Sequence, residues 1–198
     1  MATIHGVLYR TASAIVRRRL ARVMIVVTVA AAGVLTVSGA AGAASASGFN
    51  EIRNTGTGKC LDVTSEDGFF RVGARVQQYH CTRVKEQKWS VKQIISPTGG
   101  LNPAWEIINL RSGLCLGRGA FAVDGQQAIQ MGCDGSRQVA WVAGDLGNGN
   151  FYLDNLYDFR VLNLSRQSSA DHAKVQLWTY NASVAQQWRS ASFFPPAI

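Results

Sequence analysis

Hydrophobic and polar positions alternate in short runs along most of the chain. Phe49–Ile52, Trp105–Ile108 and Phe151–Leu153 alternate roughly and are rich in aromatic and β-branched residues, which favour strands. Glycine-bearing turn residues follow, as in Thr55–Gly58 and Arg111–Gly113. Beyond the N-terminal segment, no stretch of ten or more residues combines a helical period with capping residues. The pattern therefore predicts an all-β protein made of short strands.

The strand pattern repeats three times with fixed spacings. A step of eight residues separates three pairs: Cys81 and Trp89, Cys133 and Trp141, Tyr180 and Trp188. A step of six residues separates three further pairs: Asn54 and Cys60, Asn109 and Cys115, Asn155 and Val161. These marks indicate three copies of one unit, at about residues 49–95, 104–147 and 150–192.

The copies are too small to fold separately. Four short strands in each of three copies give twelve strands, and a unit of about 47 residues cannot bury both faces of its own strands. We therefore expect one shared core. The recurring tryptophan of each copy is its expected contribution, because indole supplies a large apolar area and an N–H that must find a partner.

The N-terminal segment does not fit this pattern. Basic residues from Arg10 to Arg22 precede an apolar run of 15 residues, Val23–Val37, and a small-residue stretch that ends at Ala44–Ala46. This order predicts a secretory signal peptide over residues 1–46 and a secreted, extracellular domain over residues 47–198. The run is shorter than a membrane span of about 20 residues, so an uncleaved anchor is the weaker alternative and no membrane contact is expected after cleavage. The arginine pairs leave twin-arginine export open.

Removing the signal peptide changes the charge argument. Of the 20 Lys and Arg residues five precede Ser47, whereas all 12 Asp and Glu residues follow it, so the mature chain is near +3. Its basic residues are scattered rather than clustered. The composition therefore gives no support to nucleic-acid binding.

The four cysteines fit an exported protein. The repeats suggest the pairs Cys60–Cys81 and Cys115–Cys133, each closing a loop of about 20 residues and stabilising by roughly 3 kcal/mol in the chain-entropy model. The third copy has Val161 and Tyr180 at these positions, and the joint loss of both cysteines supports the pairing. Zinc is a poor alternative because Cys-x-x-Cys and clustered histidines are lacking, so we expect no metal and no cofactor.

Three motifs recur in this register. They are Cys-Leu-Asp-Val from Cys60, Val-Gln-x-aromatic-x-Cys from Val76, and Gln-x-Trp from Gln87 and Gln186. As a set they resemble the ricin B-type lectin family, over about Phe49 to Arg189. The resemblance implies a β-trefoil, in which three four-stranded units surround a threefold axis and six strands form a short barrel capped by hairpins. The second copy departs from it, because Val139 stands where the glutamine is expected.

The resemblance also implies one shallow sugar pocket in each copy, with an acid and an aromatic stacking face. In the first copy it assigns the sugar contacts to Asp62, Gln77, Tyr79, Glu86 and Gln87. Glu86 replaces the usual asparagine and cannot donate an amide N–H, which changes the polar contacts that this pocket offers to a sugar. We expect this pocket to be the best of the three.

The other two pockets depart further from the family pattern. The second copy has Gly117, Ile129, Met131, Gln138 and Val139, without acid or aromatic residue, and is expected not to bind. The third copy has Asn163, Gln176, Trp178, Ala185 and Gln186. Its stacking face is large, but asparagine replaces the acid and alanine removes a polar partner, so a weaker site is expected.

These features predict a secreted, monomeric, non-enzymatic module that binds galactose- or xylose-type glycans. Asp62 and Glu86 superficially resemble a glycosidase pair, but an open pocket does not desolvate an acid enough to raise its pKa for catalysis. The alternative function is a scaffold for protein interaction or protease inhibition. Its contact would use the loop Glu66–Arg71, where Phe69 and Phe70 are the candidate anchors.

Overall fold

The computed structural model of the chain describes residues 48–99 and 103–191. The predicted signal peptide lies outside these residues. Within the described ranges, no helix is both long and apolar enough to cross a membrane.

The described chain contains twelve strands and three single-turn 3₁₀ helices. The strands are β1 (Arg53–Asn54), β2 (Cys60–Val63), β3 (Val76–Tyr79), β4 (Trp89–Ile94), β5 (Ala104–Asn109), β6 (Cys115–Arg118), β7 (Gln126–Met131), β8 (Trp141–Gly147), β9 (Asn150–Asn155), β10 (Val161–Leu164), β11 (Ala173–Trp178) and β12 (Trp188–Arg189). The 3₁₀ turns are η1 (Lys85–Gln87), η2 (Ser165–Gln167) and η3 (Val184–Gln186). The all-β prediction is therefore confirmed.

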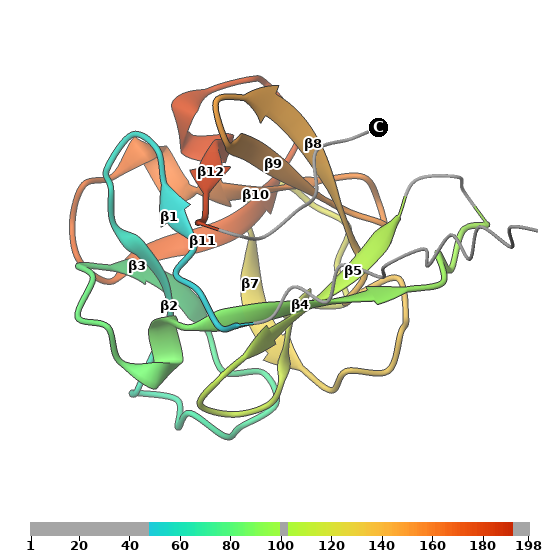
Figure 1. The fold of residues 1–198 in the computed structure, drawn as a ribbon, viewed down its shortest axis with the longest axis horizontal. Helices are drawn as coiled ribbons and strands as arrows, with labels where there is room; N and C mark the ends of the chain where they lie inside the picture. The colour runs from blue at the N-terminus through green and yellow to red at the C-terminus, as the bar shows by residue number, and fades with distance from the viewer. Residues whose placement is uncertain (1–47, 100–102, 192–198) are drawn as a thin grey trace, which may run out of the picture. The chain divides into compact units, whose positions relative to one another are not determined.

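Six strands close a barrel. The pairs β4–β5, β5–β8, β8–β9, β9–β12 and β12–β1 are all antiparallel, and a bridge between Asn50 and Trp89 joins the segment before β1 to β4. Figure 1 shows β12 (red) beside β1 (cyan), where the last copy meets the first. Closure leaves no free edge in this ring, which removes a template for aggregation.

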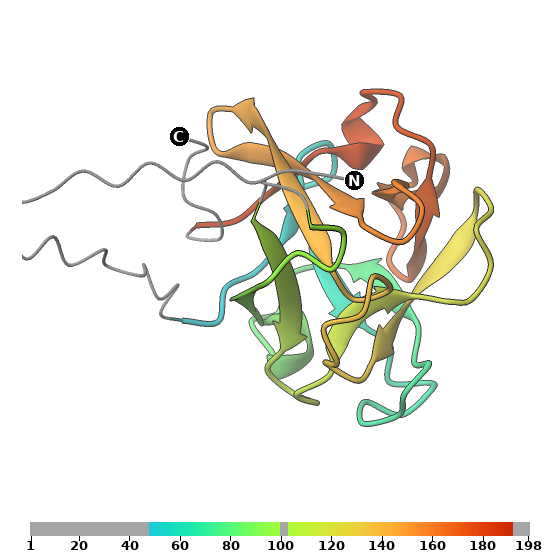
Figure 2. The ribbon, with the colours of Figure 1, turned by 90° about the vertical axis from the view of Figure 1, so that its right-hand side faces the viewer.

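The other six strands form one hairpin in each copy. The hairpins β2–β3, β6–β7 and β10–β11 meet at one end of the barrel, where β11 pairs with both β3 and β7. A bridge between Arg75 and Ile129 joins the first hairpin to the second. Each hairpin thus contacts both others, which is the threefold arrangement of a β-trefoil. In Figure 2 the β6–β7 hairpin (yellow) extends beside the strands of the third copy (red).

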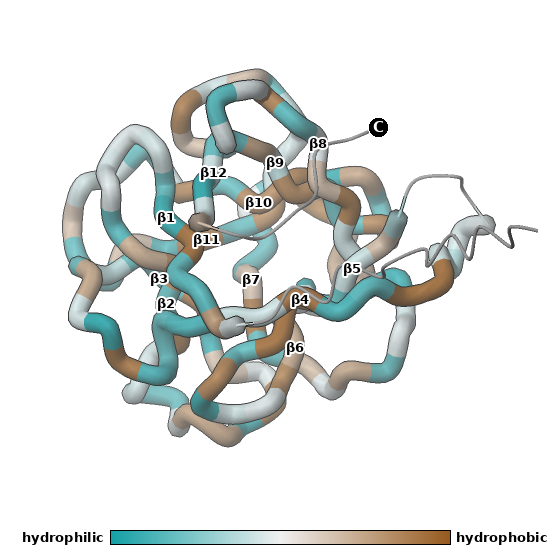
Figure 3. The backbone as a smooth tube through the Cα atoms, in the orientation of Figure 1, coloured by the Kyte–Doolittle hydropathy of each residue, from teal (hydrophilic) through white to brown (hydrophobic). Residues whose placement is uncertain are grey.

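The three recurring tryptophans fill the shared core, as expected. All three are 0% exposed and belong to one apolar cluster that takes residues from every copy. Each donates its indole N–H to a leucine carbonyl on the second strand of its own copy: Trp89 to Leu61 at 3.0 Å, Trp141 to Leu116 at 2.9 Å and Trp188 to Leu162 at 3.0 Å. Hydrophobic and polar positions alternate along the chain around this core (Figure 3).

A buried asparagine links each copy to the preceding one. The side-chain N–H of each asparagine donates to backbone carbonyls of the preceding copy, in the turn before the tryptophan of that preceding copy. The Oδ1 of the same asparagine accepts backbone N–H groups from the turn that follows it. The bonds are Asn54 Nδ2 to Val184 O at 3.2 Å, Asn109 Nδ2 to Glu86 O at 2.9 Å and Asn155 Nδ2 to Gln138 O at 3.1 Å. The cycle of three links is therefore complete.

Both predicted disulfides are present, as Cys60–Cys81 and Cys115–Cys133. In the third copy Val161 is buried, and the Tyr180 ring packs against Tyr152 with centroids 4.8 Å apart. An aromatic contact thus lies where the other copies carry a covalent bond.

Asp154, on the same strand as Tyr152, is a half-buried carboxyl without adequate partners. Its Oδ1 is buried and has no hydrogen-bond partner in the described part of the chain. Burial, with a smaller contribution from the charge of Asp158, raises the pKa of Asp154 to about 6. The ionised form is therefore disfavoured in the folded protein.

We expect Asn109→Ala to lower the free energy of unfolding by about 2 to 4 kcal/mol, because it leaves buried carbonyl and N–H groups without partners. Asn163→Ala is the matched control. Asn163 is almost as buried, but its side chain has no hydrogen bond within the described residues, so its loss should change stability by less than about 1 kcal/mol. Urea unfolding of both variants measures this; equal effects would contradict the link between copies.

We expect Asp154→Asn to stabilise the protein at pH 8 but not at pH 4. The folded pKa lies above the unfolded value, so ionisation of Asp154 destabilises the fold as pH rises from about 4 through 6. After allowance for solvent screening of this partly exposed group, the gain at pH 8 is about 1 to 2 kcal/mol. Thermal melts of parent and variant across this range test it, and a pH-independent difference would disprove the assignment.

Candidate functional site

Each hairpin carries a set of three residues that share one face. Asp62 pairs with Gln77, and Asn163 pairs with Gln176, across the second and third strands of their copies. Because side chains alternate along a strand, the aromatic residue two positions further on lies on the same face. The predicted site residues on each hairpin are therefore brought to one side.

In the first copy the polar pair is buried and already bonded. Asp62 is 5% exposed and Gln77 is 9% exposed, and Gln77 Nε2 donates to Asp62 Oδ1 at 2.9 Å. The other end of the same amide, Oε1, is 3.2 Å from His172 Nδ1. One Asp62 oxygen and both ends of the Gln77 amide are therefore engaged within the protein.

Burial raises the pKa of the Asp62 carboxyl, against the opposing hydrogen bonds from Gln77 and Gln87. The nearby charge of half-buried Glu86 adds to the rise, so two of the predicted contacts approach each other. This site is acidic, with two carboxyls on one hairpin and the turn beside it.

Two histidines pack against Tyr79, the stacking residue of the first copy. The Tyr79 ring lies against His172 and His80, with centroids 4.8 and 4.3 Å apart. His172 comes from the third copy, and the sequence alone predicts it to be a surface residue without an acidic or cysteine partner. Its backbone is left-handed, with φ 62°. The positions that correspond to it in the other two copies, Gly73 and Gly125, are also left-handed, with φ 90° and 86°.

Gln87 and Gln186 hold the turn before the tryptophans of the first and third copies. Both are 0% exposed. Gln87 donates to His80 O at 3.0 Å and accepts the Thr82 N–H at 2.7 Å. Gln186 does the same with the corresponding backbone groups of its own copy. Both side chains therefore have a structural role, and their assignment as sugar contacts stays a prediction.

In the second copy, side chains of that copy fill the place of the sugar pocket. A methyl group added at Gly117 would lie 2.9 Å from Met131 Sδ and 3.2 Å from Val139 Cγ1. Apolar atoms therefore occupy the space that a ligand would need, which agrees with the loss of acid and aromatic residue seen in the sequence.

The third copy carries an open hollow of about 920 Å³, here called the third-copy hollow. Its lining includes Asn163, Gln176 and Trp178, which lie on one face of β10 and β11. Trp178 is 37% exposed, whereas Asn163 and Gln176 are each 6% exposed. Neither amide has a hydrogen-bond partner within residues 48–99 and 103–191. Ala185, the residue expected to weaken the site, also lines the hollow.

Gly125 explains why this hollow is open. It borders Trp178 as His172 borders Tyr79: a methyl group added at Gly125 would lie 3.8 Å from Trp178 Cζ3. Because glycine has no side chain, the indole face stays accessible. The contrast between the two sites thus follows from one residue of the adjacent copy.

Two aspartates, each one residue before Gly125 or His172, fix these edges. Lys59 and His80 hold the pKa of Asp171 at about 2, through contacts of 2.7 and 2.9 Å. Asp124 accepts bonds from Arg160 and Thr179, which keep its pKa below the usual value despite the opposing effect of burial. Both are contacts between copies, which spacing within one copy does not reveal.

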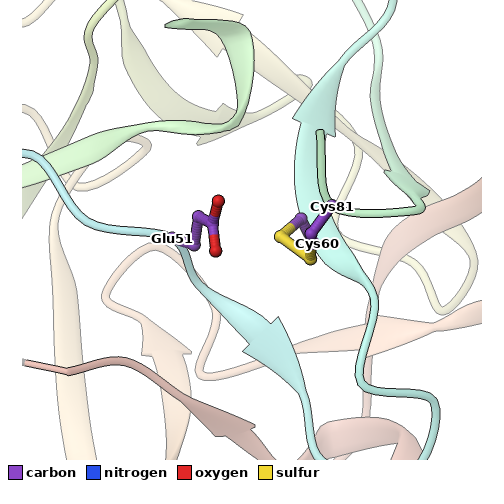
Figure 4. A group of neighbouring side chains, drawn as sticks. All are labelled: Glu51, Cys60 and Cys81. Atoms are coloured by element: carbon purple, nitrogen blue, oxygen red, sulfur yellow. A yellow bond between two sulfur atoms is a disulfide. The ribbon is translucent and has the colours of Figure 1, made fainter. Parts of the chain in front are cut away.

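Glu51, Cys60 and Cys81 lie close together as potential metal ligands, but the two cysteines cannot bind a metal ion. The Glu51 carboxylate points toward the sulfurs of Cys60 and Cys81 (Figure 4). These sulfurs are joined in a disulfide, so they are not thiolate ligands, and Glu51 forms ion pairs with Arg53 and Lys88.

Only one of the two phenylalanines expected to anchor a protein partner is exposed. Phe69 packs against the core, and Arg111 lies over its ring at 4.8 Å from the centroid. Phe70 is exposed. This loop therefore ties the first copy to the second.

We expect His172→Gly to uncover Tyr79 with little net change in stability, because the ease with which glycine adopts the left-handed conformation offsets the lost contacts with Gln77 and Tyr79. Nitration of Tyr79 by tetranitromethane, followed by mass spectrometry, should become at least about two-fold faster as the ring gains solvent contact. Tyr180, already exposed, is the internal reference. An unchanged ratio of the two rates would show that His172 does not shield the ring.

Several solved structures share this fold. A designed threefold-symmetric protein, ThreeFoil, is 26% identical, with a TM-score of 0.65 over 72% of this chain and 96% of that chain. A ricin B-like lectin from Macrolepiota procera, solved with lactose, is 21% identical, with a TM-score of 0.59 over 72% and 93%. An exo-β-1,3-galactanase from Clostridium thermocellum is 23% identical, with a TM-score of 0.65 over 73% of this chain but only 30% of the enzyme.

Comparison with curated protein sequences gave no match. The family model of the ricin-type β-trefoil lectin domain matches residues 48–188, which include all twelve strands except the last residue of β12. The match agrees with the closed barrel, the three hairpins and the three buried tryptophans. The chain therefore belongs to the ricin-type β-trefoil lectin family.

Proposed function

We propose that this protein is an exported saccharide-binding module whose principal site is the third-copy hollow. The observation that carries the proposal is that the Asn163 and Gln176 amides have no hydrogen-bond partner in the described part of the chain and line the hollow beside the exposed face of Trp178. Each amide offers an N–H donor and a carbonyl acceptor. Two such amides that open into a hollow can bind a polar ligand without breaking contacts within the protein.

The chemistry of the hollow suits a sugar ring. Each hydroxyl group both donates and accepts, and a side-chain amide offers an N–H donor and a carbonyl acceptor in return. The C–H face of a galactose- or xylose-type ring is apolar and can cover the Trp178 indole, whereas its hydroxyl edge faces the amides. A few polar groups beside an aromatic wall are typical of small-molecule sites.

The first-copy site is the secondary site in this proposal, which reverses the order expected from the sequence. Gln77 donates to Asp62, and His172 packs against the stacking ring. A sugar there must displace contacts that already exist. In the third-copy hollow no such contact has to be broken.

Membership of the ricin-type lectin family supports the saccharide as ligand class. The two disulfides support an oxidising destination, in agreement with the signal peptide proposed for residues 1–46. An open site binds a single sugar weakly, near millimolar, which corresponds to about −4 kcal/mol. Engagement of both sites by one polysaccharide would raise the apparent affinity.

The protein-scaffold alternative has less support. Phe69, one of its two expected anchors, is committed to the core and to Arg111. It also gives no role to the free amides of the third-copy hollow. A blank glycan array for the purified mature protein, together with a specific protein partner, would favour it.

We expect Trp178→Ala to weaken binding of galactan or xylan oligosaccharides by about ten-fold or more, because the buried stacking area is lost. Phe121→Ala is the matched control: Phe121 is a more exposed aromatic residue that does not line the hollow. Isothermal titration calorimetry of both variants measures the effect. Unchanged binding by Trp178→Ala would remove the third-copy hollow from the proposed function.

A further inference from the structure

The third-copy hollow differs from the first-copy site in the sign of its charge. Its lining includes two cations, Arg166 and Lys174, and no carboxylate. In the first copy, by contrast, Asp62 and Glu86 are close enough for one to raise the pKa of the other. The same fold therefore presents one acidic and one basic site.

Lys174 is placed by the strand that carries the stacking face. It lies on β11 two residues before Gln176 and four before Trp178, so all three side chains share one face. Its ammonium donates to Gly125 O at 2.5 Å, at the edge of the hollow. An ammonium has three N–H donors, so two remain for a ligand.

Arg166 is placed by an unusual backbone. Arg166 and Gln167, in η2, both adopt left-handed conformations, with φ 53° and 52°. Consecutive non-glycine residues in this region are uncommon, and such strain clusters at ligand sites. In the described part of the chain, the Arg166 guanidinium has neither an ion pair nor a hydrogen bond.

Neighbouring carboxylates do not neutralise these cations. Asp124, next to Gly125 at the edge of the hollow, forms an ion pair with Arg160 and accepts bonds from Thr179. Asp171, three residues before Lys174, is bound by Lys59 and His80. The charge of Arg166 and Lys174 is therefore available to a ligand.

We infer that the third-copy hollow selects saccharides that carry an anionic group, namely a ring carboxylate or a sulfate ester. This inference rests on the proposed function and specifies its ligand class. The sugar ring stacks on Trp178 and uses the amides of Asn163 and Gln176. Its anionic group pairs with Arg166, whose planar fork matches two acceptor oxygens, and with the Lys174 ammonium. Asn163 favours such a ligand because, unlike Asp62, it adds no repelling charge.

The test compares ligands that differ in charge alone. A galacturonic acid trisaccharide is titrated against its methyl ester, and a sulfated galactan oligosaccharide against its desulfated form, by isothermal titration calorimetry. At about 20 mM salt we expect one or both anionic forms to bind at least about ten-fold tighter, and the ratio to shrink at about 500 mM salt as charges are screened. The arm that shows the preference identifies carboxylate or sulfate.

Variants distinguish the preference for anionic saccharides from saccharide binding itself. Arg166→Gln should reduce the ratio toward one, whereas Trp178→Ala should weaken binding of neutral and anionic forms alike. Arg137→Gln is the control, because it removes one charge from an exposed position outside the hollow. Far-UV circular dichroism and thermal melts check that each variant is folded.

Two outcomes would overturn the inference. Equal binding of neutral and anionic forms would leave the proposed function standing and remove the preference for anions. A preference that survives Arg166→Gln and Lys174→Gln, or falls as much with Arg137→Gln, would assign it to general charge instead of this site. Absence of any saccharide binding by the folded parent would end the proposed function itself.

Discussion

The structure depends on the cyclic link between copies. No copy closes its own strands, so each asparagine at the end of a first strand bonds the turn before the tryptophan of the preceding copy. That turn in turn fixes the tryptophan, whose indole N–H bonds the second strand of its own copy. Core packing and contact between copies are therefore one network.

Pseudo-symmetry leaves the binding positions free to diverge. Burial holds the tryptophans and asparagines in the same role in every copy, whereas the aromatic positions Tyr79 and Trp178 on the hairpins are partly exposed and differ in their surroundings. One position is filled by Met131 and Val139, one is partly covered by His172, and one is open beside Gly125. In the first and third copies, a residue at the edge of the adjacent copy decides whether the stacking face is accessible.

Because the binding positions lie on the hairpins and not in the shared core, the sites can also differ in charge. The first-copy site holds Asp62 and Glu86, whereas the third-copy hollow holds Arg166 and Lys174. Under the proposed function, one small fold thus presents two sites of opposite charge to a saccharide.

The sequence alone determined the repeat, the strand content, both disulfides and the inward tryptophans. These features follow from local spacing and from the burial of apolar side chains, which a linear pattern records directly. The resemblance to the ricin B-type family also assigned Asp62 and Tyr79 to one site and Asn163 and Trp178 to another.

Only the tertiary structure decided which face is open. His172 and Gly125 act on sites in the following copy, and Asp124 and Asp171 bind across the same boundaries, so no spacing within one copy reveals them. The buried state of Gln87 and Gln186 was equally hidden, because an amide can serve a ligand or a turn with the same chemistry. Contacts between copies, which form when the barrel closes, determine which stacking face is open.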